Sequence, residues 1–233
     1  MPEKPMAGAV LVAGGVGSRL KAGTRKTNLK LGGRAIFEWP LLSLLKSPHI
    51  GEVALVLHPS DYAARLAWAK RQKFKKRVEL VKGGAQRQDS VANGLSALYH
   101  GWDVLMVQDA ARPFLKLSLI RDCVLTAKKR GGAIAVVPVK DSIKLIDGPR
   151  LKSLPRERLL AAQTPQAYAG GVLLRAHAWA QQRKHYYTDE ASLLEARGHP
   201  SLPVMAYYEN FKITTPEDYE SAKRVIKTFN FNG

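Results

Sequence analysis

Residues 9–26 of the chain read AVLVAGGVGSRLKAGTRK. The opening run, Ala9 to Ala13, consists of small and β-branched apolar residues, which is typical of a short buried strand. We expect this strand to end at Gly14, Gly15 and Gly17, whose missing β-carbons allow backbone N–H groups to close around an anion. The stretch therefore predicts a strand that leads directly into an anion-binding loop.

Positive charge follows the glycines at once, at Arg19, Lys21, Arg25 and Lys26. Backbone dipoles and mobile cations that converge on one point suit a triphosphate. A glycine-rich turn beside surface cations is the alternative for these residues alone. Two familiar phosphate loops do not fit. A dinucleotide fingerprint needs glycine where Leu20 stands, and a Walker loop needs glycine directly before the lysine, where this chain has Arg25.

The composition is ordinary for a folded soluble protein: of the 233 residues, 45% are hydrophobic and 24% are charged. We expect residues 1–233 to form a single domain. No apolar run approaches the roughly 20 residues that span a bilayer, and the start MPEKPMAG does not predict a secretory signal, so we expect no membrane partner. The single cysteine, Cys123, excludes an internal disulfide and fits a reducing compartment, so we expect a cytoplasmic protein.

The net charge of +18 favours polyanionic partners through long-range attraction, without specifying which. Local support for nucleic acid is strongest at Lys70–Arg77, which reads KRQKFKKR. This run carries one aromatic residue, lies between a helical pattern and a strand pattern, and belongs to no recognisable nucleic-acid-binding motif. A solvated helix end is the favoured interpretation, and we do not expect nucleic acid to be a partner.

Short apolar runs alternate with helical patterns along most of the chain. Strands are predicted over residues 9–13, 52–57, 78–81, 103–107, 133–139 and 204–208. Helices are predicted over residues 36–45, 61–72 with Asp61 as the cap, 91–98, 117–129 and 170–181, and two more are predicted to begin near Thr188, with a hydroxyl cap, and near Thr215. Apolar strands separated by helices indicate an α/β, Rossmann-like fold, whose mostly parallel sheet has helices on both faces.

Three loops, at residues 14–26, 83–90 and 109–112, follow predicted strands. Ligands of such sheets lie beyond the carboxyl ends of the strands, so these loops should line one crevice. Residues 140–161 depart from the pattern and predict a protruding β-hairpin arm with a turn at Asp147-Gly148. The hairpin has little apolar area of its own, so we expect it to lean on another surface, a second subunit being one candidate.

The residue types favour phosphate chemistry. The six histidines have no metal-ligand spacing, and no nucleophile motif with a paired histidine is present, so we expect no protein metal site and no covalent catalysis. Phosphoryl transfer needs positioning and positive charge where charge develops on oxygen. We expect Arg19, Lys26 and Lys212 to supply that charge. Asp109, at a strand end, suits a divalent cation or a sugar hydroxyl, with capping of the next helix as the alternative.

Motifs spread over nearly the whole chain resemble one known family. In order they are AGGVGSR (13–19), the Lys26 segment, GGAQRQDSV (83–91), VQDAARP (107–113), PVKDS (138–142), Arg156, QTPQ (163–166), TDEAS (188–192) and NFKIT (210–214). The pair DAARP and TDEAS is highly specific. On these motifs the chain resembles the 2-C-methyl-D-erythritol 4-phosphate cytidylyltransferases of the non-mevalonate isoprenoid pathway.

The resemblance implies a nucleotidyltransferase that transfers CMP from CTP to 2-C-methyl-D-erythritol 4-phosphate, giving a CDP-polyol and pyrophosphate. Mg²⁺ would bind mainly through the CTP phosphates. By position, the implied catalytic residues are Arg19, Lys26 and Lys212. The implied nucleotide-binding residues are Ala13, Gly14, Gly15, Gly17, Gly84, Ser90 and Asp109. The implied substrate-binding residues are Arg112, Ser142, Arg156, Thr188 and Asp189, of which Arg156 would reach the site of a partner across a homodimer formed through the arm.

The chain departs from the family pattern at a few positions. Arg25-Lys26-Thr27-Asn28 stands where Pro-Lys-Gln-Tyr is usual, so we expect a more mobile Lys26 loop before ligand binds, with Arg25 as a competing charge. Ala85 replaces a usual acidic residue in the nucleotide loop, Ser142 replaces a common threonine, and Pro155 replaces the usual acidic residue before Arg156.

Two alternatives stay open at this point. The first is the same transfer onto ribitol 5-phosphate, because related enzymes share most of these motifs and differ at the polyol pocket. The second is a non-catalytic relative that binds nucleic acid through its basic surface, for which the changed Lys26 loop is the specific support.

Overall fold

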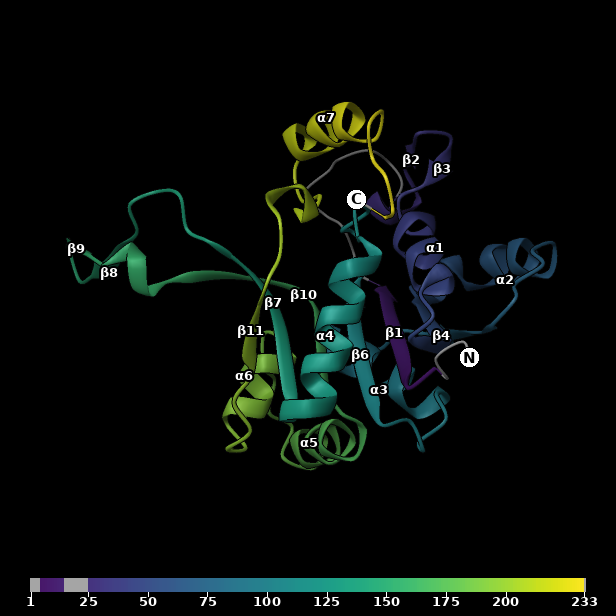
Figure 1. The fold of residues 1–233 in the computed structure, drawn as a ribbon, viewed down its shortest axis with the longest axis horizontal. Helices are drawn as coiled ribbons and strands as arrows, with labels where there is room; N and C mark the ends of the chain where they lie inside the picture. Colours follow the sequence, from purple (N-terminus) through teal and green to yellow (C-terminus); the bar gives the residue numbers. More distant parts are fainter. Residues whose placement is uncertain (1–4, 15–24, 233) are drawn as a thin grey trace.

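The computed structural model describes residues 5–14 and 25–232, which form a mixed seven-stranded sheet with helices packed on it (Figure 1). The strands are β1 (Ala7–Ala13), β4 (Ile50–Leu57), β5 (Arg77–Lys82), β6 (Val104–Asp109), β7 (Gly132–Pro138), β10 (Leu160–Ala169) and β11 (Leu202–Met205). Their order across the sheet is β11-β7-β10-β6-β1-β4-β5. β10 runs antiparallel to β6 and β7, whereas the other neighbouring strands pair in parallel. The predicted α/β fold with a mostly parallel sheet is therefore confirmed.

Helices cover both faces because the side chains of a strand alternate between them. The helices are α1 (Glu38–Lys46), α2 (Tyr62–Lys70), α3 (Arg87–Ala97), α4 (Leu117–Arg130), α5 (Gly170–Gln182), α6 (Glu190–Glu195) and α7 (Pro216–Val225). Ala9 and Leu11 of β1 belong to a core that includes residues of α1 and α4. Val10, between them, belongs to the opposite core, which includes residues of α3, α5 and α6.

β10 is the strand that the apolar pattern does not predict. Its central residues, Gln163 to Gln166, are mostly polar, yet they are buried. Hydrogen bonds make that burial possible: the side chain of Gln166 donates to Asp189 at 2.8 Å, and the hydroxyl of Thr164 accepts from the backbone N–H of Asp109 at 3.0 Å. Polar contacts, rather than an apolar run, therefore hold this strand in the middle of the sheet.

α3 begins earlier than predicted. Its first residue is Arg87 rather than Val91, because the side chains of Gln86 and Asp89 form a reciprocal capping box at its N-terminus. The earlier start places Arg87 in the first turn of the helix, at the carboxyl edge of the sheet.

The predicted hairpin is present as β8 (Lys144–Asp147) and β9 (Arg150–Ser153), which project from the body on the left of Figure 1. Every residue of both strands is exposed. The turn contains Gly148 with a φ of 57°, in the left-handed region that favours glycine. The short helix η4 (Arg156–Arg158) connects the hairpin to β10.

A smaller core closes the molecule beyond the carboxyl ends of the strands. It joins the hairpin of β2 (Lys30–Leu31) and β3 (Arg34–Ala35) to α7, around the buried residues Leu31, Ile36, Phe114, Ile213 and Ala222. The segment between η5 (Tyr208–Asn210) and α7 carries Lys212. Next to it, the N–H of Ile213 donates to the carbonyl of Ala111 at 2.8 Å, which holds Lys212 beside the end of β6.

Among residues 5–14 and 25–232, no helix has the length and apolar character needed to cross a membrane.

Candidate functional site

A pocket of about 580 Å³ lies at the carboxyl edge of the sheet, beyond β1, β4, β5 and β6. Its lining consists of Val12, Gly14, Lys26, Thr27, His58, Pro59, Gly83, Gly84, Ala85, Gln86, Arg87, Ser90, Asp109, Ala111 and Lys212. Six of these are among the predicted site residues: Gly14, Lys26, Gly84, Ser90, Asp109 and Lys212. The three predicted loops therefore share one crevice in the part of the chain that the structure describes. Gly15, Gly17 and Arg19 lie outside the described residues.

The loop between β5 and α3 presents its backbone to the pocket. The hydroxyl oxygen of Ser90 accepts a hydrogen bond from the N–H of Gly84 at 3.1 Å. The N–H of Gly83 donates to the carbonyl of Leu57 at 2.7 Å, which ties the loop to the end of β4. A β-carbon on Gly84 would lie 2.4 Å from Cβ of Asp89, so glycine is required there by close approach.

Four charged side chains, Glu190, Arg87, Asp109 and Lys212, form a continuous series that we call the charge chain. Nη1 and Nη2 of Arg87 donate to the two carboxylate oxygens of Glu190 at 2.9 and 3.0 Å. Nε and Nη2 of Arg87 both lie 3.4 Å from Oδ1 of Asp109. Nζ of Lys212 donates to Oδ2 of Asp109 at 2.7 Å. The charge chain thus runs from the start of α6, through the first turn of α3, to the pocket.

Asp109 is ionised in this setting. Burial alone would raise the pKa of Asp109, but the charges of Arg87, Lys212 and Arg112 outweigh it and hold the pKa well below its ordinary value. Burial would likewise lower the pKa of Arg87, but Glu190 and Asp109 raise it instead. Asp109 and Arg87 are therefore both charged at neutral pH.

Lys26 lies on the short helix η2 (Lys26–Asn28) in the pocket wall. Arg25 and the side-chain amide of Asn28 both donate to the carboxylate of Asp61, each at 2.9 Å, and Arg65 donates to Asn28 at 2.9 Å. The prediction that Asp61 caps the following helix through its side chain is therefore wrong. The carboxylate anchors the Lys26 segment instead. Arg25, expected as a competing charge, is paired with Asp61 and stands outside the pocket lining.

Two predicted site residues are buried and stand outside the pocket lining. Ala13 lies at the end of β1 with 2% of its surface exposed. Arg112 is also buried, and its Nη1 donates to the carbonyl of Asn210 at 2.9 Å. Arg112 thereby supports the segment that leads to Lys212.

Thr188 and Asp189 lie at the start of α6, next to Glu190. The carboxylate of Asp189 caps the helix by accepting from the N–H of Ser192 at 2.9 Å. The predicted hydroxyl cap is therefore wrong: the hydroxyl of Thr188 lies 3.3 Å from that of Ser192 instead. Both predicted residues are outside the pocket lining, but they adjoin the charge chain.

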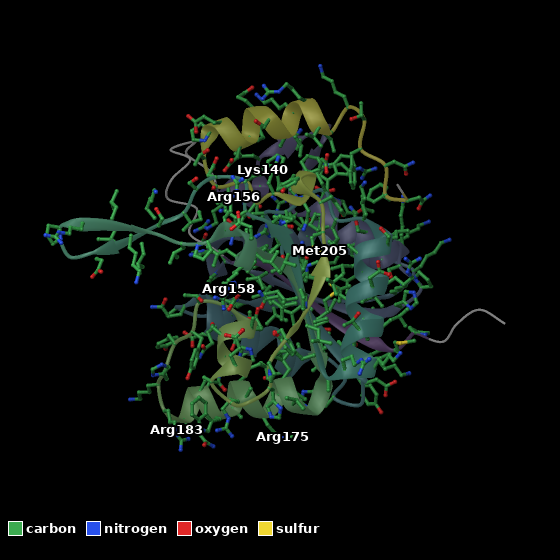
Figure 2. All side chains as sticks on the ribbon, turned by 60° about the vertical axis from the view of Figure 1, so that its left-hand side comes forward. Lys140, Arg156, Arg158, Arg175, Arg183 and Met205 are labelled. Atoms are coloured by element: carbon green, nitrogen blue, oxygen red, sulfur yellow. The ribbon has the colours of Figure 1, made fainter. Side chains whose placement is uncertain are left out.

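Ser142 and Arg156 are exposed at the base of the hairpin arm. Nη1 of Arg156 donates to the carbonyl of Lys140 at 2.9 Å. Figure 2 shows Lys140 and Arg156 side by side where the arm leaves the body. Neither Ser142 nor Arg156 belongs to the pocket lining of this chain.

Arg87 and Glu190 are site residues that the sequence analysis missed. In the sequence, Arg87 is a cation after a glycine turn and Glu190 is an acid in the first turn of a helix. The structure pairs them across 103 positions and buries Glu190 almost completely. The available signal was the presence of both residues inside motifs of the resemblance, which does not identify the pairing.

The pocket combines a backbone-lined loop, two lysines and one carboxylate, which suits a bound polyphosphate. Among the described residues, no group of three or more His, Cys, Asp or Glu is placed to hold a metal ion. Both oxygens of Asp109 already contact cations. This donor set fits a Mg²⁺ ion that takes most of its ligands from a polyphosphate, with at most one from Asp109.

Comparison with known proteins gives one family. Residues 7–228 match the family described as 2-C-methyl-D-erythritol 4-phosphate cytidylyltransferase. The enzyme of that name from Pelotomaculum thermopropionicum is 41% identical over 222 residues, covering 94% of this chain and 93% of that protein. The enzyme of the same name from Halalkalibacterium halodurans is 37% identical and covers 93% of this chain and 95% of its own length.

Solved structures agree. A 2-C-methyl-D-erythritol 4-phosphate cytidylyltransferase from Thermus thermophilus superposes with a TM-score of 0.77 at 29% identity, covering 94% of this chain and 98% of that one. A 4-diphosphocytidyl-2C-methyl-D-erythritol synthase from Anaerococcus prevotii shares the fold with a TM-score of 0.84, at 24% identity and 96% coverage of both chains.

Proposed function

This chain belongs to the 2-C-methyl-D-erythritol 4-phosphate cytidylyltransferase family, and we propose that it transfers the cytidylyl group of CTP to 2-C-methyl-D-erythritol 4-phosphate with release of pyrophosphate. The proposal assigns the protein to the non-mevalonate isoprenoid pathway. The observation that carries it is the pocket, where Lys26 and Lys212 face a glycine-lined loop at one edge of the sheet.

In the proposed reaction a phosphate oxygen of the polyol substrate attacks the α-phosphorus of CTP, and pyrophosphate leaves on the opposite side. Both reacting groups belong to substrates, so the protein needs no nucleophile of its own. Its contribution is to align the two phosphates and to stabilise the negative charge that gathers on the α-phosphate oxygens. We assign this stabilisation to Lys26 and Lys212, together with Arg19.

Lys212 can serve this role without leaving the charge chain. An ammonium group has three N–H donors, and one of them is held by Asp109 at 2.7 Å. The remaining two are available to α-phosphate oxygens. Asp109 thus aims the ammonium before substrate arrives, which lowers the reorganisation needed in the transition state.

We assign the nucleotide to the backbone around residues 13–17 and to the loop that contains Gly84 and Ser90. Backbone N–H and carbonyl groups can form the hydrogen bonds that distinguish one base from another. Bound Mg²⁺ would neutralise triphosphate charge and orient the leaving group, with Asp109 as the protein group placed to contact it. Asp109 also suits a ribose hydroxyl.

We assign the binding of the polyol phosphate to Ser142, Thr188 and Asp189. Arg112 contributes by supporting the segment that carries Lys212. Arg156 is assigned to the substrate phosphate in the site of a second subunit, which makes the active form a homodimer joined through the arms. Support comes from the position of Arg156 at the base of an arm in which every strand residue is exposed.

The test is a steady-state assay of pyrophosphate release with CTP, Mg²⁺ and either 2-C-methyl-D-erythritol 4-phosphate or ribitol 5-phosphate. We expect kcat/KM to be higher for the methylerythritol phosphate by about 10²-fold or more. If ribitol 5-phosphate were turned over faster, it would replace 2-C-methyl-D-erythritol 4-phosphate as the proposed substrate. Absence of turnover with either substrate, together with salt-dependent RNA binding, would favour the non-catalytic relative instead.

A further inference from the structure

The charge chain has an asymmetry at Arg87. Its guanidinium gives two short hydrogen bonds to Glu190, at 2.9 and 3.0 Å, but only two long contacts to a single oxygen of Asp109, at 3.4 Å. Arginine prefers to engage a carboxylate through two parallel hydrogen bonds. Here Glu190 receives that bidentate arrangement and Asp109 does not.

The asymmetry leaves one oxygen of Asp109 for Lys212. Oδ1 faces Arg87, and Oδ2 accepts the 2.7 Å hydrogen bond from Nζ of Lys212. If Glu190 did not hold the guanidinium, Arg87 would be free to close on Asp109 and take both oxygens. Lys212 would then lose its partner, because a guanidinium that engages both oxygens of a carboxylate holds it more strongly than a single hydrogen bond from an ammonium does.

We propose that Glu190 is a positioning residue for Lys212: by occupying Arg87, it reserves Oδ2 of Asp109 for the lysine. Glu190 is not itself part of the pocket lining, and it acts on Lys212 through Arg87 and Asp109, two side chains that do line the pocket. Because Glu190 is the first residue of α6 and follows Thr188 and Asp189, the same contact links the segment assigned to the polyol with the cation assigned to the α-phosphate. The expected effect on kcat rests on the proposed function, whereas the expected effect on the contact between Lys212 and Asp109 does not.

Glu190→Gln is the primary test. Glutamine keeps the volume but turns an N–H₂ group toward Arg87, which drives the guanidinium to Asp109. We expect kcat to fall roughly 10-fold to 100-fold, as for a displaced catalytic group, with a smaller change in KM for CTP. A crystal structure of the variant should show Arg87 bidentate on Asp109 and the contact between Lys212 and Asp109 broken.

The double variant Glu190→Gln with Arg87→Gln provides the sharper test. Without the guanidinium of Arg87, both oxygens of Asp109 stay open to Lys212, while Arg112 remains on the carbonyl of Asn210. We therefore expect kcat to recover to within about 3-fold of the unmodified enzyme, a non-additive result. A purely structural role for the pair predicts the opposite, since the second substitution would add to the damage. A double variant as slow as Glu190→Gln would overturn the proposal and give Arg87 a direct role toward substrate.

The matched control is Glu52→Gln. Glu52 is also a buried carboxylate paired with an arginine, Arg77 at 3.3 Å, but it lies near the amino end of β4, away from the pocket. We expect this control to lower the melting temperature and leave kcat unchanged.

The structural readout separates the two proposals. If the unmodified enzyme does not transfer CMP, the proposed function fails, while the crystal structure of Glu190→Gln still tests the positioning. Retention of the contact between Lys212 and Asp109 in that variant would overturn the inference whether or not the double variant folds.

Discussion

At the scale of single residues, the neighbours of Lys26 help to fix its position in the pocket wall. Arg25 and Asn28, on either side, both bind Asp61 and so hold the segment against α2. Because the segment is held, Lys26 can present its ammonium to the pocket without the proline that usually precedes it in the family.

We predict that Lys26→Ala lowers kcat by about 10²-fold or more, because it removes a preorganised cation from the transition state. Turnover of CTP with the polyol phosphate measures this loss. The control is Lys30→Ala on β2, an exposed lysine outside the pocket lining, which should retain full turnover. Comparable rates for the two variants would remove Lys26 from the mechanism.

His177 on α5 predicts a pH dependence of stability. The residue is 3% exposed, and neither ring nitrogen has a hydrogen-bond partner among the described residues. Burial lowers the pKa of His177 and Arg87 lowers it further, whereas Glu190 opposes the shift. The folded protein therefore resists protonation at a pH where the unfolded chain accepts a proton, so the free energy of unfolding should fall as the pH drops below about 6.5.

Urea denaturation at pH 7.5 and pH 5.5 tests this prediction. His177→Leu should remove part of the difference in unfolding free energy between the two pH values. His100→Gln, at an exposed histidine, should leave the difference unchanged. The prediction fails if both variants keep the full pH dependence.

At the scale of elements, α3 seats closely on the sheet through Gly94. A β-carbon there would lie 2.5 Å from Cγ1 of Val10 and 2.7 Å from Cγ2 of Val56. We predict that Gly94→Ala lowers the free energy of unfolding by about 1–3 kcal/mol through overpacking, even though alanine favours a helix over glycine by about 1 kcal/mol. Urea denaturation measures the change.

Gly171→Ala is the matched control for that substitution. Gly171 is exposed in the first turn of α5, and a β-carbon there would meet only the flexible end of Arg175. This variant should be neutral or more stable by up to about 1 kcal/mol. Equal stability of the two variants would mean that α3 can move away from the sheet at little cost.

The elements that could be predicted from the sequence are those whose burial leaves an apolar pattern. β1, β4 and β6 follow from continuous apolar runs, and α7 from Thr215, Pro216 and Asp218 at its start. β10 could not be predicted, because its buried centre, residues 163–166, is polar and depends on partners distant in the chain.

Some features of the site could likewise be predicted from the sequence, and others could not. Glycine turns and strand ends predicted which loops meet, because parallel strands end at one edge of a sheet. They could not predict that Glu190 holds Arg87 or that Asp61 holds Arg25, since both pairings join segments far apart in sequence. Long-range ion pairs leave no local periodicity, so only the folded structure reveals them.

At the scale of the whole molecule, the exposed arm leads us to expect a homodimer. Ile146 and Leu151 are 78% and 68% exposed on its two strands. We predict that Ile146→Ser combined with Leu151→Ser weakens the proposed homodimer, because apolar area is lost from its interface. Sedimentation should then show monomer at concentrations where the unmodified protein is a dimer. Lys144→Ser, on the same arm, is the control and should leave the dimer intact.

The role proposed for Arg156 gives the same assembly a kinetic signature. Arg156→Ala should chiefly raise the KM for the polyol phosphate, because the lost cation binds substrate from the partner's arm. Mixed dimers with Lys26→Ala subunits should regain activity, since one of the two sites then combines an intact Lys26 with an intact arm. A failure of mixed dimers to regain any activity would place Arg156 in its own subunit's site.

The position of β10 between β6 and β7 also governs how the chain can assemble as it leaves the ribosome. After residue 138 has emerged, β5, β4, β1 and β6 can already pair, but β7 has no neighbour, because both of its partners, β10 and β11, are still to come. A nascent chain halted between residues 138 and 160 therefore exposes an open edge on β6 and a solitary apolar strand. Such edges recruit other chains, so premature termination in this interval should yield insoluble fragments, whereas release after β11 completes the sheet.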